Sequence, residues 1–248
     1  MDVFKAYAEF YDALYKDKDY MSEAADVSNL LKKWGRNIHS VIVYGCGTGK
    51  HDRCLKSLGY DIHGIDMSEQ MVKEAVKADS EIGYEVADIR EYIPKKKYDA
   101  VVSLFHVMSY QNTNEDIKKA FSSARKALNK GGIFLFDVWN GPGVLSDPPV
   151  LRVKKVETEK YDVTRIARPV THANTNIVDV NYEMIVIEKE TKLLSEIHEN
   201  HHMRYFFRPE IDEYLTMEGF ELEESVDCKS MEEPGFESWT VYYVAKAM

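Results

Sequence analysis

The first half of the chain alternates short apolar runs with stretches whose apolar residues recur at helical spacing. Five of the short runs are expected to be strands: Ser40–Tyr44 (SVIVY), 60–65, 82–87, 98–105 and 133–138. Three helical stretches separate them: 50–58, a helix capped by Ser68, and a helix from Asn114 that Gly131 and Gly132 should end. This alternation predicts a parallel sheet with crossover helices.

The pattern changes after a loop rich in Gly and Pro at 139–149. From 151 to 207 the apolar period is two, as in the alternation of Val178, Val180 and Tyr182 with mostly polar neighbours. A period of two with one wet face is typical of antiparallel strands, so this region predicts a meander of three or four strands.

Helical spacing returns at Pro209 and stops at Gly219, and two last strands are expected at 220–226 and 239–245. We therefore expect an α/β fold: a Rossmann-like, seven-stranded, mostly parallel sheet with an inserted antiparallel β cap. The predicted core comprises 1–149 and 208–248, and the predicted cap comprises 150–207.

Composition narrows the class of protein. A hydrophobic fraction of 44% with 12% aromatic residues is typical of a globular chain. The 42 acidic residues outnumber the 32 basic ones, for a net charge of −10. Because a phosphate backbone is bound by clustered Lys and Arg, this charge disfavours a nucleic-acid partner.

The chain is expected to be cytoplasmic. No apolar run approaches the roughly 18 residues that a membrane span needs, and the acidic, tyrosine-rich N-terminus does not resemble a signal peptide. Cys46, Cys54 and Cys228 are odd in number and lack metal-type spacing, which is typical of reduced thiols inside a cell.

A glycine loop, Gly45-Cys46-Gly47-Thr48-Gly49, directly follows the first strand and precedes a helix. Such glycines let the backbone approach a ligand at a helix N-terminus. The phosphate-binding P-loop is excluded because Tyr44 stands at its first glycine and His51 at its hydroxyl position. The dinucleotide fingerprint is excluded because Lys50 stands at its third glycine.

The remaining pattern, Gly-x-Gly-x-Gly, resembles the first motif of class I S-adenosylmethionine methyltransferases. The resemblance implies an enzyme of this class, with S-adenosylmethionine as its cofactor, held at Gly45, Cys46, Gly47 and Gly49. One position departs from the family: Val43 stands where an acidic residue usually precedes the loop.

Further candidate cofactor residues lie at the expected carboxyl ends of strands, where open parallel sheets bind ligands. Asp66, next to Met67, stands about 20 residues after the glycines, where an acid accepts hydrogen bonds from ribose hydroxyls. The resemblance implies contact of Asp88 and its neighbour Ile89 with adenine, and a methionine end lined by Leu104 and Phe105. Singly, each acid could instead be a strand-end turn or cap residue.

His106 is the candidate catalytic base because it follows the fourth strand, near the expected methyl group; it could equally be a polar residue satisfied at a strand end. Tyr7, Tyr11 and Tyr20 could form a lid over the sulfonium or belong to a helix that packs on the core. Tyr11 and Tyr20 are the preferred candidates for cofactor contact.

The histidine-rich run 198–202 is not expected to bind a metal. On a strand, His198, Asn200 and His202 share one face and His201 takes the other. Two histidines four residues apart on a strand are about 13 Å apart, too far for one ion. A polar face over a substrate cleft, or in solvent, is the preferred interpretation.

The aromatic N-terminal segment 7–12, the Gly49-x-His51 continuation and the cap are similar to the sugar N-methyltransferases, and the cap also to glycine N-methyltransferases. Runs at 136–139, 177–182 and 204–207 resemble methyltransferases associated with surface-polysaccharide synthesis. These resemblances imply a small polar acceptor, such as an amino sugar or nucleotide sugar in glycan biosynthesis, bound by the cap and methylated on N or O.

Two other functions stay open. The chain could be a non-catalytic partner subunit that binds S-adenosylmethionine or S-adenosylhomocysteine, or it could methylate RNA or protein. Charge disfavours the last, as does Ser103-Leu104-Phe105-His106 in place of an Asn/Asp-Pro-Pro-Tyr/Phe-like motif. A cap edge strand could pair with a second copy to form a homodimer.

Overall fold

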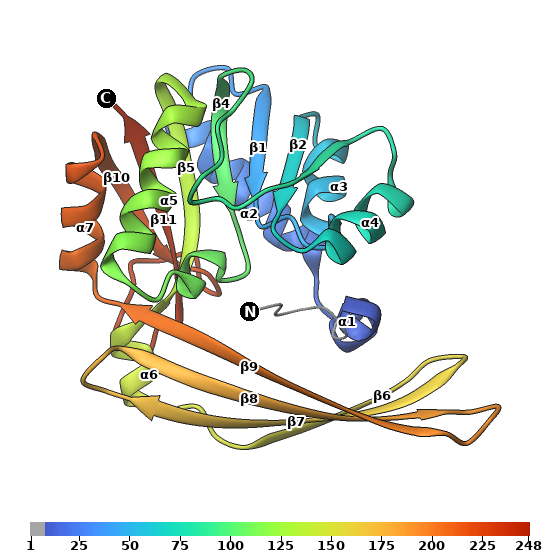
Figure 1. Ribbon diagram of the computed structural model, residues 1–248. Coiled ribbons are helices and arrows are strands. Elements are labelled where there is room, and N and C mark those ends of the chain that lie inside the picture. The colour runs from blue at the N-terminus through green and yellow to red at the C-terminus, as the bar shows by residue number, and fades with distance from the viewer. Residues whose placement is uncertain (1–7) are drawn as a thin grey trace.

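The computed structural model describes residues 8–248, so Tyr7 lies outside the described residues. Its core is a seven-stranded sheet in the order β3-β2-β1-β4-β5-β11-β10 (Figure 1). The first five are parallel, and β11 runs antiparallel to both β5 and β10. The strands are β1 (Ser40–Tyr44), β2 (Asp61–Asp66), β3 (Gly83–Val86), β4 (Tyr98–Ser103), β5 (Leu128–Asn140), β10 (Phe220–Asp227) and β11 (Thr240–Ala247). The predicted mostly parallel, Rossmann-like sheet is confirmed.

Helices cover both faces of this sheet, which is why its central strands are apolar at consecutive positions. In β5, Phe134 and Phe136 pack in the layer under α5 and α7, whereas Leu135 packs in the layer under α2 and α3. The helices of the core are α2 (Tyr20–Trp34), α3 (Lys50–Ser57), α4 (Glu69–Ala78), α5 (Asn114–Ala127) and α7 (Arg208–Met217).

Four antiparallel strands, of which the first is short, form a second layer across the carboxyl ends of the parallel strands (Figure 1). They are β6 (Arg152–Glu157), β7 (Tyr161–His172), β8 (Ile177–Glu188) and β9 (Leu194–Phe206). The end of β9 pairs with the end of β5 through Trp139–Tyr205 and Asn140–Phe206. This short parallel pairing holds one end of the layer against the core.

The N-terminal helix α1 (Ala8–Leu14), which carries Tyr11, packs on the antiparallel layer, whereas Tyr20 begins α2, which packs on the core sheet. Phe10 and Leu14 are buried among Val156, Val163 and Met184 of that layer. The apolar face of α1 therefore covers the inner surface of β6, β7 and β8.

Two local expectations are wrong. The helix expected to end at Gly131 and Gly132 already ends at Ala127, because Leu128 adopts an extended backbone and pairs with Tyr98; both glycines lie within β5. The loop expected at 139–149 contains a short helix, α6 (Gly141–Ser146), with Pro142 in its first turn. The pattern also left α2 unassigned.

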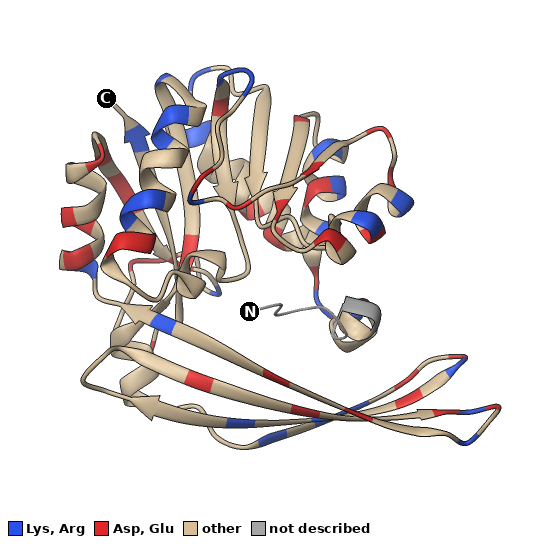
Figure 2. Cartoon of the chain, viewed as in Figure 1, with Lys and Arg blue, Asp and Glu red and all other residues tan. Residues whose placement is uncertain are grey.

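Charged residues of both signs are interspersed on α3 and α4 and along the antiparallel strands (Figure 2). Among residues 8–248, no helix is long and apolar enough to cross a membrane.

Candidate functional site

The glycine loop joins β1 to α3 through three left-handed backbone conformations. Gly45, Gly47 and Gly49 have φ of 71°, 55° and 72°. The N–H groups of Gly45 and Cys46 donate to the Ile65 carbonyl of β2, at 2.8 and 2.9 Å. Because left-handed φ is costly for residues with a Cβ, glycines allow this loop to turn tightly at the sheet edge.

Asp66, the last residue of β2, is bound to the glycine loop. Its Oδ2 accepts from the Gly47 N–H at 2.9 Å and its Oδ1 from the Ser68 N–H at 2.8 Å. Burial raises the pKa of Asp66, and these two N–H groups offset part of that shift. A carboxylate has about four acceptor positions, so the two N–H groups leave acceptor capacity for a ligand with neighbouring hydroxyls.

Asp88 lines the same edge of the sheet but is bound to Arg90. The Arg90 Nε lies 2.9 and 3.0 Å from the two Asp88 oxygens, and the Arg90 Nη1 lies 3.0 Å from Asp116 of α5. Burial raises the pKa of Asp88, but the hydrogen bonds from Arg90 outweigh it and leave the pKa lowered. The side chain is therefore an ionised carboxylate with much of its acceptor capacity used.

The turn after β4 is held by a buried acid that the sequence analysis did not single out. Phe105 and His106 have φ of 64° and 68°. Asp137 of β5 accepts from both backbone N–H groups, at 3.1 and 2.8 Å, and is only 5% exposed. Its Oδ2 also lies 3.1 Å from His106 Nδ1, without hydrogen-bond geometry. The sequence did hold an indication of this role, because Asp137 is the only charged residue in the apolar run 133–138.

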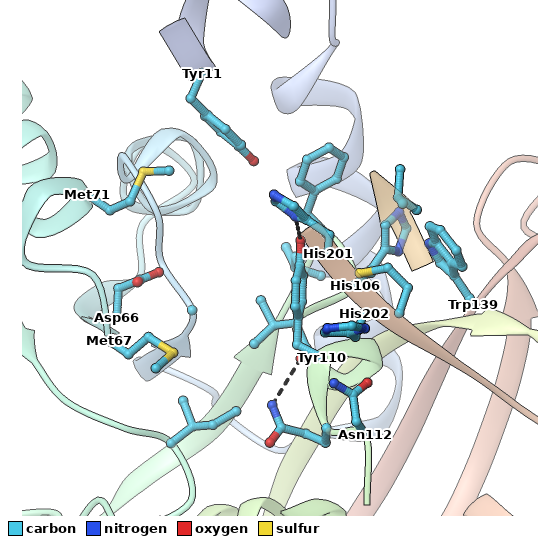
Figure 3. Close-up of a pocket in the computed structure, with 18 of the residues that line it drawn as sticks. Tyr11, Asp66, Met67, Met71, His106, Tyr110, Asn112, Trp139, His201 and His202 are labelled. Atoms are coloured by element: carbon cyan, nitrogen blue, oxygen red, sulfur yellow. Dashed lines mark hydrogen bonds between the residues drawn. The ribbon is translucent and has the colours of Figure 1, made fainter. Parts of the chain in front are cut away.

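These elements surround a pocket of about 620 Å³ between the core sheet and the antiparallel layer. In Figure 3, Asp66, Met67 and Met71 lie on one side and His106, Trp139 and His202 on the other. The pocket brings together nine of the residues singled out from the sequence: Tyr11, Gly45, Asp66, Met67, Asp88, Ile89, Leu104, Phe105 and His106.

Four singled-out residues, Tyr20, Cys46, Gly47 and Gly49, are not among the residues that line this pocket. Tyr20 begins α2 and packs against His51, with ring centroids 4.8 Å apart. Burial raises the pKa of the Cys46 thiol, which makes it an unreactive packing group. Gly47 nevertheless contributes through its hydrogen bond to Asp66.

The opposite wall comes from β8 and β9, where Val180, Tyr182, Asn200, His201, His202 and Met203 line the pocket. His201 is 3% exposed, and its Nδ1 lies 2.7 Å from the Tyr110 hydroxyl. Tyr110 ends the short 3₁₀ helix η1 (Val107–Tyr110) that follows β4. The sequence pattern placed His201 apart from His198 and His202 but did not identify Tyr110.

The other histidines of this region engage acids. His202 Nδ1 and His172 Nε2 approach the carboxylate of Asp179 at 2.5 and 2.9 Å. Within the described part of the chain, no group of three His, Cys, Asp or Glu side chains is arranged to hold a metal ion.

Comparison with known proteins identifies the class. A family model described as "Methyltransferase domain" matches residues 41–132. The chain is 27% identical over 220 residues to dTDP-3-amino-3,4,6-trideoxy-alpha-D-glucopyranose N,N-dimethyltransferase of Streptomyces venezuelae, covering 88% of this chain and 91% of the relative. It shares the fold of an S-adenosylmethionine-dependent methyltransferase from Clostridium acetobutylicum, with TM-score 0.83, 20% identity and 98% of each chain covered. The chain is an S-adenosylmethionine-dependent methyltransferase, similar to the class I enzymes.

A second solved structure shows the same fold: CalS10 with bound S-adenosylmethionine, an amino pentose methyltransferase from Micromonospora echinaspora. Its TM-score is 0.77 at 18% identity, with 99% of this chain and 98% of that chain covered. S-Adenosylmethionine is the cofactor of the methyltransferase described here.

The departure at Val43 has a clear structural consequence in this methyltransferase. Val43 is 2% exposed and packs in the apolar layer under α2 and α3. The position therefore offers packing and no carboxylate, and Asp66 is the acid that holds the glycine loop from β2.

Proposed function

We propose that this methyltransferase transfers the cofactor's methyl group to an amine or hydroxyl of a small, polar, sugar-like acceptor. The observation that carries the proposal is a single pocket of about 620 Å³ whose walls are strand ends of the core on one side and β8 and β9 on the other. Small-molecule sites commonly enclose about 300–1,000 Å³, so this volume suits a cofactor with a small second ligand.

The core side of the pocket is the proposed cofactor site. Asp66, with acceptor capacity beyond its two backbone N–H partners, suits the ribose hydroxyls. Asp88 and Ile89 are proposed to lie against adenine, and the Asp88–Arg90 pair leaves Asp88 as an acceptor only. The remaining proposed contacts are Met67, the backbone of Gly45, Cys46, Gly47 and Gly49, and Leu104, Phe105, Tyr11 and Tyr20 at the methionine end.

Bound there, S-adenosylmethionine supplies an electrophilic methyl group on a sulfonium. The contribution of the protein is alignment of the acceptor with that methyl group and removal of the acceptor's proton. His106, which lines the pocket beside Asp137, is the candidate base proposed from the sequence.

The antiparallel layer, 150–207, is the proposed acceptor-binding cap. Its inner face contributes aromatic, amide and imidazole groups, Tyr182, Asn200 and His201, to the pocket. Such groups suit a ligand with many hydroxyls. The Streptomyces venezuelae relative is named for dimethylation of a dTDP-linked amino sugar. Its alignment covers 88% of this chain, so it must include part of the cap. This supports a nucleotide-linked amino sugar as the first acceptor to test.

The proposal is tested in two steps on the full chain. Calorimetric titration should show binding of S-adenosylmethionine and S-adenosylhomocysteine in the micromolar range. Methyl transfer is then followed by mass spectrometry with nucleotide-linked amino sugars and with the matching hydroxy sugars. Turnover of an amino sugar but not of its hydroxy counterpart would establish N-methylation. Cofactor binding without turnover of either class would contradict the proposed acceptor.

A cap variant tests the assignment of the acceptor side. Val180 lines the pocket from β8, so Val180→Phe should fill acceptor space and raise the acceptor KM about tenfold or more while the cofactor Kd changes less than about threefold. Val170→Phe is the matched control, because Val170 lies on β7 and is 49% exposed. Equal effects of both variants would argue against the acceptor site proposed here.

The cytoplasmic location, the role in glycan biosynthesis, the lack of a nucleic-acid partner and the homodimer stay predictions. For the homodimer, β6 is the edge strand of the cap, so we propose Arg152–Glu157 as the segment that would pair with a second copy. Sedimentation velocity of the full chain over a concentration series tests this.

A further inference from the structure

One buried and two partly buried side chains form a hydrogen-bonded chain between the cap and the core. The Tyr110 hydroxyl lies 2.7 Å from His201 Nδ1, and His201 Nε2 lies 3.1 Å from Glu199 Oε2. Figure 3 marks the first of these bonds within the pocket. The His201 and Glu199 side chains are only 4% and 9% exposed, although they are polar or charged groups. Buried polar groups of this kind are usually retained in a defined network.

The chemistry of the three groups determines where the hydrogens lie. An ionised carboxylate only accepts, so Glu199 requires a hydrogen on His201 Nε2. In a neutral imidazole the other nitrogen is then an acceptor, so Nδ1 receives the Tyr110 hydrogen. Having donated its hydrogen to His201, the Tyr110 oxygen can act only as an acceptor toward a ligand in the pocket.

The Tyr110–His201–Glu199 chain reaches the pocket in which the methyl acceptor is proposed to bind. Tyr110 lies four residues after His106, at the end of η1, and both residues line the pocket. Glu199 and His201 lie two residues apart on one face of β9, opposite Tyr182 and Val180 of β8 in the strand register. The edge of the His201 ring meets the Tyr182 ring at 89° with centroids 4.8 Å apart, which fixes the plane of the imidazole.

We propose that Tyr110 is a catalytic residue that takes the proton from the methyl acceptor and passes its own proton to His201, which Glu199 orients and stabilises. This inference rests on the proposed function. As the bond from the acceptor N or O to the methyl carbon forms, the carbon–sulfur bond breaks and its electron pair stays on sulfur. The acceptor proton moves to the Tyr110 oxygen, the phenolic proton moves to His201 Nδ1, and the resulting imidazolium is neutralised by Glu199.

The transfer has to be concerted at Tyr110. Burial raises the pKa of Tyr110 far above its usual value, so a free-standing tyrosinate is strongly disfavoured. Simultaneous gain and loss of a proton avoids that state, as in other catalytic groups oriented by a histidine and a carboxylate. His201 and Glu199 are therefore positioning residues that act through Tyr110.

Several titratable groups surround the Tyr110–His201–Glu199 chain and will influence how kcat depends on pH. Tyr182 of β8 packs on His201, and Arg165 of β7 lies over the Tyr182 ring, 5.0 Å from its centroid. Arg165 Nη1 also donates to the Tyr15 hydroxyl at 3.2 Å. Asp66 and Glu199 act electrostatically on Tyr110 and, with the nearby tyrosines, disfavour its anion.

His106 is the competing base, and its surroundings differ. Its Nδ1 lies 3.1 Å from Asp137 Oδ2 without hydrogen-bond geometry, and Asp137 is already used by two backbone N–H groups. His106 therefore lacks the directional hydrogen bond that selects one tautomer in the Tyr110–His201–Glu199 chain.

The test compares Tyr110→Phe, His201→Gln and Glu199→Gln with the wild type, using an acceptor identified as above. We expect kcat to fall about 100-fold for Tyr110→Phe and about tenfold or more for the other two, with the cofactor Kd within about threefold. The kcat–pH profile should differ from that of the wild type in His201→Gln, because glutamine cannot take the phenolic proton of Tyr110. In spectra of ¹⁵N-histidine-labelled protein, His201 should be the Nε2–H tautomer in the wild type and lose that preference in Glu199→Gln.

Matched controls come from the same strands outside the pocket. His198→Gln and Glu196→Gln alter exposed side chains of β9, and Tyr205→Phe removes a hydroxyl that bonds the Ala173 carbonyl. All three should keep the wild-type kcat and pH profile. An active wild type with undiminished kcat in Tyr110→Phe, or a large loss in His106→Gln alone, would overturn the relay. A wild type that turns over no acceptor would instead contradict the proposed function itself.

Discussion

The backbone N–H of Gly47 donates to Asp66 Oδ2 at 2.9 Å, so the glycine loop after β1 and the acid at the end of β2 form one unit. Asp66 thereby serves two purposes: it fixes the loop and presents acceptor capacity to the pocket. Loss of this carboxylate should affect ligand binding twice, through the missing contact proposed for the ribose and through a less ordered loop.

Asp66→Ala is therefore expected to weaken S-adenosylmethionine binding about 100-fold, since hydrogen bonds to a charged group contribute roughly 1.5–3 kcal/mol. Isothermal titration calorimetry measures the change. Asp61→Ala is the control, because Asp61 begins the same strand, is exposed, and bonds Lys96 at 3.3 Å far from the loop. Similar losses in both variants would show that β2, not the carboxylate, carries the effect.

The sequence predicted most of the core because each strand is a compact run bounded by glycine or charge. β1 is predicted to the residue, and the cap strands follow from their period of two. The helix α2 was not predicted because the helical spacing of its apolar residues is less distinct than in α4 or α5: the polar Ser28 lies on its buried face between Val27 and Leu30. The start of β5 at Leu128 was not predicted because Leu128 fits both the helical spacing of α5 and an extended strand.

The part of the site formed by the ends of successive strands could be predicted, because the order of the strands along the sequence determines where those residues lie. In a parallel sheet, residues that end successive strands meet at one edge, which is why Asp66, Asp88 and His106 line one pocket. The contact of Tyr110 with His201 was not predictable in this way, since 91 residues separate them. It depends on how the cap lies over the core, which a pairing of only two residues between β5 and β9 helps to set.

Gly45 and Gly47 both need left-handed φ, but they differ in surrounding space. An added Cβ at Gly45 would lie 2.4 Å from the Val107 side chain, whereas at Gly47 nothing lies within 4 Å. Gly47→Ala should lower the free energy of unfolding by about 1 kcal/mol from backbone strain alone, and Gly45→Ala by about 3 kcal/mol or more because of the added clash.

Urea denaturation of the apo protein measures both values. Gly45→Ala should lower the free energy of unfolding less in a Val107→Ala background than in the wild type, because Val107→Ala removes the side-chain atoms that clash with the added Cβ. Strict additivity of the two changes would contradict the proposed contact.

Asp137 should contribute strongly to stability. Asp137→Ala leaves the N–H groups of Phe105 and His106 without their carboxylate partner, so we expect a loss of about 2–4 kcal/mol. Ser109→Ala is the comparison, since it removes one acceptor, from the Trp139 N–H, and should cost about half as much. A loss in Asp137→Ala no greater than that in Ser109→Ala would show that the turn rearranges to satisfy its N–H groups elsewhere.

Asp52 predicts an unusual dependence of stability on pH. It lies in the first turn of α3, is fully buried, and neither carboxyl oxygen has a hydrogen-bond partner among the described residues. Burial raises its pKa to about 8. The folded protein thus keeps this proton through neutral pH, whereas the unfolded chain loses it above about pH 4. Unfolding then releases a proton in this window, and Asp52 lowers stability as the pH rises.

Asp52→Asn removes the ionisable group and with it this slope. Relative to the wild type, the variant should gain stability from pH 4 to pH 8 by up to about 1.4 kcal/mol per pH unit, with no further gain above pH 8. Guanidinium denaturation at each pH measures the difference. Asp99→Asn should behave oppositely. Burial raises the pKa of Asp99, but hydrogen bonds from Ser40 and His39 outweigh it and leave the pKa lowered. The Asp99 carboxylate therefore stabilises the fold at neutral pH, and this stabilisation is lost on acidification. A constant difference between Asp52→Asn and the wild type across the window would mean that Asp52 is ionised in the folded protein, which would require a cation or a water-filled space next to it.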